Sequence, residues 1–186
     1  MKLHRFLVIA TLLVSGCQSV PKPPLAQVAK VDLPRFMGDW YVIASIPTFI
    51  ETNAYNAVES YRLAADGTVE TTFTFRKGGF DGPLKRYTPR GYVLDPVSNA
   101  VWGMQFVWPV KADFRIAWLA PDYGQTVIAR TKRDYVWIMA RTPQIAEADY
   151  ARIVQFVAAQ GYDVTRLRKV PQGWDAGLSD PQGTAR

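Results

Sequence analysis

The sequence contains only one cysteine, Cys17, and one histidine, His4. Both fall in the N-terminal segment, and the processing predicted below leaves a mature chain with no imidazole and no free thiol. Zinc sites made of cysteine and histidine, Ser-His-Asp triads and Cys-His pairs are therefore excluded. A disulfide bond within the chain is excluded as well, because that bond needs two cysteines.

A secretory signal is predicted over residues 1–16. Lys2 and Arg5 give it a basic start, and the apolar run of residues 6–14 is too short to span a bilayer. The sequence Leu-Val-Ser-Gly-Cys, which ends at Cys17, resembles the lipobox of bacterial lipoproteins. The resemblance implies cleavage before that cysteine and attachment of lipid to it. The alternative is an ordinary signal followed by an unrelated cysteine.

The segment after the signal indicates where the protein is held. Several acyl chains on Cys17 would keep it on a membrane, and Gln18 and Ser19 resemble the residues that direct lipoproteins to the outer membrane. The predicted location is therefore the outer membrane, with the folded part facing the periplasm. Residues 17–31 include several prolines and are predicted to be a tether. The net charge of +6 suits an anionic partner, and outside the cytoplasm that partner is lipid rather than nucleic acid.

The remaining chain fits one domain, since 48% of all residues are hydrophobic and 20% are charged. Short apolar segments separated by turn residues predict eight strands with short, and hence antiparallel, connections. Such strands can close into an up-and-down barrel, although a two-sheet sandwich has the same alternation. The predicted strands are residues 40–46, 57–63, 68–75, 87–94, 100–108, 114–119, 126–131 and 135–141.

The pattern changes after Pro143. Apolar residues at helical spacing predict a helix over residues 146–160, which is weakly capped because Ala146 precedes it. A final strand over residues 163–170 and a polar tail over residues 171–186 complete the chain. The expected fold is all-β, an eight-stranded antiparallel barrel with one C-terminal helix and a short last strand.

Three separated motifs over residues 32–170 resemble those of the lipocalins, and most closely the bacterial outer-membrane lipocalins. They are Gly38-Asp39-Trp40-Tyr41, Pro121-Asp122-Tyr123 and the segment from Tyr135 to Pro143 that contains Arg141. The resemblance implies a calyx that binds a hydrophobic ligand, without a cofactor or metal. It also implies a fold signature at the closed end, where Trp40 packs under Arg141. The residues of that signature are Gly38, Trp40, Asp122, Tyr123 and Arg141.

Strict alternation along the strands predicts which side chains line the barrel. It directs Val42, Ala44 and Ile46 inward, together with a set of mostly aromatic residues. The alternative is that these side chains fill the barrel and leave no cavity. The predicted ligand-binding residues are Tyr61, Phe73, Phe75, Met104, Phe106, Trp108, Phe114, Trp118, Trp137 and Met139.

Glu59 departs from this apolar pattern, because it faces the same way as Ala57 and Tyr61. A desolvated carboxyl group there would have a raised pKa and could donate or accept a proton. The alternatives are a place at the wet mouth of the barrel or a shift of register at a bulge.

Basic residues in the loops at the open end predict a positively charged rim, represented by Arg76, Lys77, Lys111 and Arg133. Such a rim suits an anionic amphiphile, so fatty acids or lysophospholipids are the predicted ligands. Two other classes remain open at this point. One is a structural or partner-binding lipoprotein with a filled barrel, and the other, less favoured because no second catalytic group is evident, is a lipid-modifying enzyme.

Overall fold

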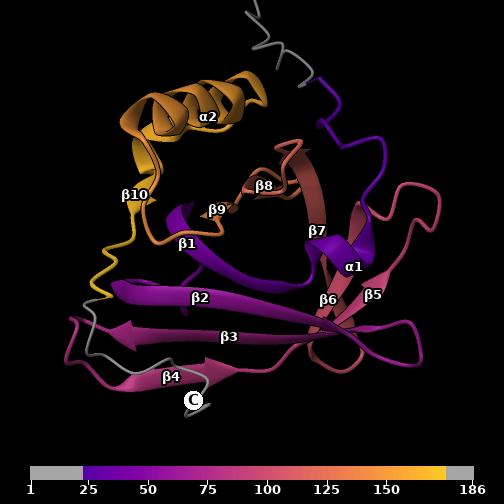
Figure 1. The fold of residues 1–186 in the computed structure, drawn as a ribbon, viewed down its shortest axis with the longest axis horizontal. Coiled ribbons are helices and arrows are strands. Elements are labelled where there is room, and N and C mark those ends of the chain that lie inside the picture. Colours follow the sequence, from indigo (N-terminus) through magenta and orange to yellow (C-terminus); the bar gives the residue numbers. More distant parts are fainter. Residues whose placement is uncertain (1–22, 175–186) are drawn as a thin grey trace, which may run out of the picture.

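The computed structural model describes residues 23–174. The predicted signal, Cys17 and most of the predicted tail lie outside the described residues. Within the described residues ten strands form one antiparallel sheet, nine of which close into a barrel with a helix outside it (Figure 1). No helix among the described residues is long and apolar enough to cross a membrane.

Strands that follow one another in the chain pair, except that β4 and β5 both pair with β3, and β1 also pairs with β9. That last pairing closes the sheet, so the predicted barrel is confirmed and a sandwich is not. The strands are β1 (Gly38–Ile46), β2 (Ala54–Leu63), β3 (Val69–Lys77), β4 (Leu84–Tyr87), β5 (Arg90–Val93), β6 (Val101–Val107), β7 (Val110–Leu119), β8 (Gln125–Ala129) and β9 (Val136–Ala140).

The predicted strand over residues 87–94 is divided in two. β4 and β5 both pair with β3, and Pro89 lies between them. Proline has no N–H group to donate to a sheet, which explains the interruption. Together β4 and β5 occupy one strand position, so the barrel has the eight positions predicted.

β-Bulges interrupt the alternation that the sequence analysis assumed. One lies in β1 between Val42 and Ala44, and another lies in β7 between Ile116 and Trp118. One extra residue in a strand sends every later side chain to the opposite face. The prediction that Ala44 and Ile46 point into the barrel is therefore wrong, since both pack on its outside in the cluster under the helix.

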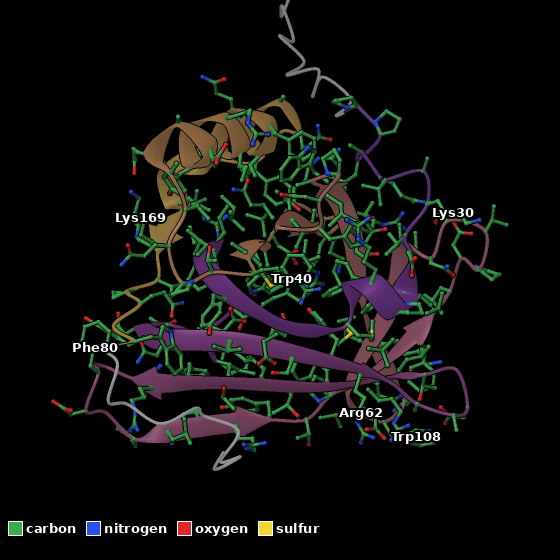
Figure 2. The ribbon with its side chains drawn as sticks, viewed as in Figure 1. Lys30, Trp40, Arg62, Phe80, Trp108 and Lys169 are labelled. Carbon is green, nitrogen blue, oxygen red and sulfur yellow. The ribbon has the colours of Figure 1, made fainter. Side chains whose placement is uncertain are left out.

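A short helix, α1 (Leu33–Phe36), closes one end of the barrel and was not predicted. The side chain of Asp32 caps it by accepting from Arg35 N, and Phe36 is completely buried. The rings of Trp40, Tyr61 and Trp102 all lie within 5.7 Å of the Phe36 ring, centroid to centroid. This aromatic cluster fills the closed end. Trp40, which is completely buried, lies near the middle of the view in Figure 2.

Arg141 fixes α1 to the barrel. Its guanidinium lies 3.8 Å from the Trp40 ring and donates hydrogen bonds to four backbone carbonyl oxygens, of Asp39 and of residues 35, 36 and 37. The contact between Trp40 and Arg141 that the family resemblance implies is therefore present. Gly38 has a φ of +93° beneath this guanidinium, where other residues would be strained.

The helix α2 (Glu147–Ala159) packs on the outside of the barrel beside β8 and β9 (Figure 1). Its N-cap residue, Ala146, makes no side-chain capping hydrogen bond, as expected. Ile153 and Val157 are buried against the outer face of the sheet. The helix covers the apolar side chains that the bulges turn outward.

The C-terminal segment differs from the prediction of a strand over residues 163–170. Asp163 accepts hydrogen bonds from Thr165 N and Oγ1 and starts a 3₁₀ helix, η1 (Val164–Arg166). Within the predicted strand, only the two residues of β10 (Arg168–Lys169) form a strand, and they pair with β1. Gln172 then donates to the carbonyl oxygens of Val42 and Ala57, so the start of the predicted tail packs between β1 and β2.

The described part of the predicted tether also contacts the barrel. Val28 N donates to Ile116 O and Val31 N donates to Ser98 O, and Val31 is completely buried. These contacts hold residues 28–31 against the closed end and the outer face of β7. Contacts continue toward the N-terminus, because Ala26 N donates to Gln160 Oε1 and Pro23 O accepts from Arg133.

Candidate functional site

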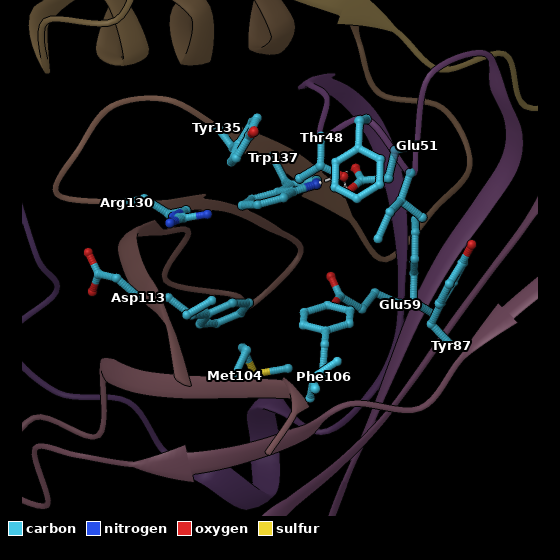
Figure 3. A pocket seen from close by; sticks show the side chains of 16 residues that line it. Thr48, Glu51, Glu59, Tyr87, Met104, Phe106, Asp113, Arg130, Tyr135 and Trp137 are labelled. Carbon is cyan, nitrogen blue, oxygen red and sulfur yellow. Dashed lines mark hydrogen bonds between the residues drawn. The ribbon is translucent and has the colours of Figure 1, made fainter. Parts of the chain in front are cut away.

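A cavity of about 370 Å³ occupies the open half of the barrel. The loop after β1 and the hairpin between β6 and β7 form its mouth, and apolar side chains form most of its walls (Figure 3). The barrel is therefore not filled. Of the ten predicted ligand-binding residues, five line this cavity: Phe73, Met104, Phe106, Phe114 and Trp137.

Three predicted ligand-binding residues, Tyr61, Phe75 and Met139, are buried in the core of the barrel but do not line the cavity. Tyr61 belongs to the aromatic cluster at the closed end, where its ring packs against Trp102 at 5.6 Å. The inward orientation of these three predicted residues agrees with the predicted alternation. Their position below the cavity was not predicted, because alternation determines which face of the sheet a residue occupies and not where the cavity ends.

Two further residues, Trp108 and Trp118, lie outside the barrel, so their prediction as ligand-binding residues is wrong. The bulge in β7 turns Trp118 toward α2, where its ring centroid is 6.4 Å from that of Phe156. A bulge in β6 between Met104 and Val107 leaves Trp108 at the hairpin tip, 82% exposed (Figure 2). Phe106 remains at the mouth, about half exposed.

Much of the lining was not predicted from the sequence. The loop after β1 contributes a polar and an apolar group of side chains, although it was expected only to connect two strands. The apolar pair Phe49-Ile50 within that loop is the signal that was available. The lining residues not predicted are Thr48, Phe49, Ile50, Glu51, Tyr87, Val107, Ala112, Asp113, Arg130 and Tyr135.

Glu59 projects from β2 into the cavity (Figure 3). Its strand neighbours in register are Trp40 on β1 and Phe73 on β3. Burial raises the pKa of Glu59 to about 7, the Tyr61 hydroxyl beside it lowers that value in part, and the charge of Glu51 raises it. The bulge in β2 precedes Val58 and leaves Glu59 pointing inward. Neither the wet mouth nor a register shift therefore describes this residue.

Glu51 supplies a second carboxyl group to the cavity from the loop after β1. Its two oxygens accept hydrogen bonds from Trp137 Nε1 at 2.7 Å and from Thr48 Oγ1 at 2.8 Å (Figure 3). Burial raises the pKa of Glu51, and these two hydrogen bonds offset only part of the rise. The cavity thus combines aromatic walls with two desolvated carboxyl groups.

The other two charged residues of the lining have ionic partners. Asp113 accepts from Arg115 Nε at 3.0 Å and from Thr131 N at 2.7 Å. Burial would raise the pKa of Asp113, but these hydrogen bonds and the charge of Arg115 outweigh it and lower the pKa. Arg130 pairs with Asp134 at 3.4 Å. Both pairs stabilise the loops around the mouth.

The four residues predicted as a basic rim do not line the cavity. Lys111 lies on the outer face of the barrel, with its Nζ 3.7 Å from the centre of the Tyr92 ring. Arg133 donates to the carbonyl oxygens of Gln160 and Pro23, which ties its loop to the end of α2 and to the N-terminal segment. The prediction that these two cations face the opening is wrong, because Lys111 packs on Tyr92 and Arg133 bonds to backbone carbonyl oxygens.

Arg76 and Lys77 are the last two residues of β3, and their side chains bond to backbone carbonyl oxygens of neighbouring loops. Arg76 Nη1 donates to Gly82 O, and Lys77 Nζ donates to Thr52 O. The second bond joins the end of β3 to the loop after β1. The charges nearest the cavity are consequently acidic rather than basic.

The barrel, its closed end and its cavity agree with comparisons against known proteins. A family model described as a lipocalin-like domain matches residues 31–172. The chain is a lipocalin. Members of this family are generally binding proteins for hydrophobic ligands rather than enzymes.

Two relatives of this lipocalin cover most of its length. It is 32% identical to temperature-induced lipocalin-1 of Arabidopsis thaliana, over 81% of this chain and 84% of that one. It is 28% identical to the outer membrane lipoprotein Blc of Citrobacter freundii, over 89% of this chain and 93% of that one. Among solved structures, insecticyanin from Manduca sexta matches with a TM-score of 0.62 and 15% identity, over 82% of this chain and 86% of that chain. This last likeness concerns the fold alone.

Proposed function

We propose that this lipocalin binds and carries single-chain lipids, fatty acids or lysophospholipids, as a lipoprotein of the outer membrane. The observation that supports the ligand class is the cavity of about 370 Å³, which lies within the range of about 300–1,000 Å³ typical of small-molecule sites. Its walls are mainly aromatic and aliphatic, as burial of an acyl chain requires.

The proposed location is supported by the N-terminal sequence and by the relatives named outer membrane lipoproteins. Lipid on Cys17 would anchor the chain, and the residues that follow would space the barrel from the membrane surface. Val28 and Val31 bond to the backbone of Ile116 and Ser98, and no residue from 23 to 31 lines the cavity.

Replacing Cys17 with alanine tests the anchor. We expect the variant to be found in the soluble fraction, or to accumulate uncleaved, because no thioether lipid can form. Fractionation of cells followed by mass measurement of the N-terminus checks this. If the variant is processed normally and stays in the outer membrane, the proposed anchor is wrong.

Replacing Ala112 with tryptophan tests the cavity as the binding site. Ala112 lines the cavity from β7, opposite Met104 on β6, so a large side chain there would occupy the ligand's volume. Native mass spectrometry of the anchor-free protein purified from cells should detect lipid on the wild type and much less on the variant. Ala151→Trp on the exposed surface of α2 is the control and should keep the lipid. An empty wild-type protein, or equal lipid on all three, would contradict the proposal.

A further inference from the structure

The charges of the cavity lining are not balanced. Asp113 and Arg130 each have an oppositely charged partner, Arg115 and Asp134 respectively. Glu51 and Glu59 do not: within residues 23–174 neither forms an ion pair with a lysine or an arginine. The described lining therefore contains two carboxyl groups that no lysine or arginine compensates.

An uncompensated buried carboxylate is costly, because the interior solvates it less well than water does. Glu51 keeps two hydrogen bonds, from Trp137 and Thr48, so its carboxylate is held in a fixed direction. Glu59 has the Tyr61 hydroxyl as its neighbour. A ligand that brings a positive charge would pair with both groups and remove this cost.

The walls around the two carboxyl groups also suit a cation. Phe49, Phe73, Phe106, Tyr135 and Trp137 line the same cavity (Figure 3). The faces of aromatic rings attract ammonium groups, and quaternary ammonium ligands are commonly recognised by such aromatic surroundings. Carboxylates and aromatic rings together recognise an alkylammonium group better than they recognise a carboxylate or a phosphate.

We propose that Glu51 and Glu59 form a subsite for the ammonium group of an amphiphile, a protonated alkylamine or a quaternary ammonium, whose hydrocarbon chain lies on the wall formed by β6 and β7. That wall presents Met104, Phe106 and Phe114, and it carries no unpaired charge in the described structure. The inference rests on the proposed function for the single hydrocarbon chain, and it narrows the head group: it favours a lipid that carries an ammonium group, such as some lysophospholipids, over a fatty acid. It replaces the anionic preference that a basic rim predicted.

The test uses three probes with the same chain length, decyltrimethylammonium, decanoate and 1-decanol, below their micellar concentrations. Isothermal titration calorimetry at pH 8 with the delipidated, anchor-free protein should give the order ammonium, then alcohol, then carboxylate. Losing both carboxylates in the variant Glu51→Gln/Glu59→Gln should weaken ammonium binding by about tenfold or more, the worth of one or two charge-assisted contacts. Binding of decanol should stay within about twofold, because the apolar wall is unchanged.

Glu70→Gln is the matched control, since Glu70 pairs with Arg62 on the outer face of β2 and β3. It should leave all three affinities unchanged.

The inference is overturned if decanoate binds the wild type at least as tightly as the ammonium probe, or if the double variant keeps the ammonium preference. If the alcohol binds and no ammonium preference exists, only this inference fails. If none of the three probes binds, the proposed function fails with it. The single variant Glu59→Gln should lose less affinity for the ammonium probe than the double variant does. If the single variant loses no affinity, that result also counts against the subsite.

Discussion

Arg141→Ala is expected to lower the free energy of unfolding by about 3 kcal/mol. The wild-type guanidinium donates to four backbone carbonyl oxygens and covers the indole of Trp40 at 3.8 Å. Three of those carbonyls belong to residues 35–37, at the end of α1. Without the guanidinium, these acceptors lose their partners and the closed end of the barrel loses its fixed contact with α1.

Urea denaturation followed by circular dichroism measures the effect. Arg166→Ala is the control, because Arg166 is exposed in η1 and should change stability by less than about 0.5 kcal/mol. Arg141→Lys should recover only part of the loss, since one ammonium group cannot reproduce a planar fork of donors. A variant Arg141→Ala that unfolds at the same urea concentration as the control would contradict this account of the closed end.

The closed end could be predicted from the sequence because its parts belong to short motifs. Gly38 and Trp40 are two residues apart in one motif, and Arg141 lies within another, so their contact follows once the family is recognised. The hydrogen bonds to the carbonyls of α1 could not be predicted. They depend on a four-residue helix whose only local signals are the capping Asp32 and a proline at its start.

The cavity lining was harder to predict, because inward and outward faces exchange at bulges. The sequence of β7 alternates without a break from Phe114 to Trp118, yet the pairing with β8 inserts one extra residue and turns Trp118 outward. A bulge is a property of two strands in register, so one strand's sequence does not reveal it. Phe114, which precedes the bulge in β7, and Phe73, whose strand β3 contains no extra residue, were placed correctly for the same reason.

The acidic character of the cavity depends on contacts between distant parts of the chain. Glu51 belongs to a loop, and its orientation comes from Trp137, 86 positions later in the sequence. Glu59 was recognised as an exception on an apolar face. The sequence did not show that cations assigned to the rim, such as Arg133, donate hydrogen bonds to backbone carbonyl oxygens instead.

The ionisation of Glu59 should make stability fall as the pH rises from about 4.5 to about 7, by about 3 kcal/mol. Burial raises its pKa to about 7 in the folded state, whereas the unfolded chain has the ordinary value of 4.5. Between these values the folded protein keeps a proton that the unfolded chain has released. The stabilisation is therefore complete below pH 4.5 and is lost as the pH rises through 7. Glu51 acts in the same direction, because its pKa is also raised.

Other carboxyl groups work in the opposite direction and in a lower pH range. Asp66, Asp95 and Asp163 have pKa values below the ordinary 3.8, mainly because neighbouring hydroxyl groups donate to them. Their contribution is present above that pH and disappears as the pH falls further. A loss of stability with rising pH between 4.5 and 7 consequently identifies the two carboxyl groups of the cavity.

The measurement is the free energy of unfolding in urea at pH 5 and pH 8, for the wild type and for Glu59→Gln. The variant should be less dependent on pH than the wild type over this interval and more stable than it at pH 8, because glutamine carries no charge to bury. Glu70→Gln should keep the wild-type dependence. Saturating decyltrimethylammonium should stabilise the wild type more at pH 8 than at pH 5, since the ammonium group pairs with the ionised carboxylate. If the wild type and Glu59→Gln share one pH dependence, Glu59 is not desolvated in the cavity, and its assignment to an ammonium subsite loses its physical basis.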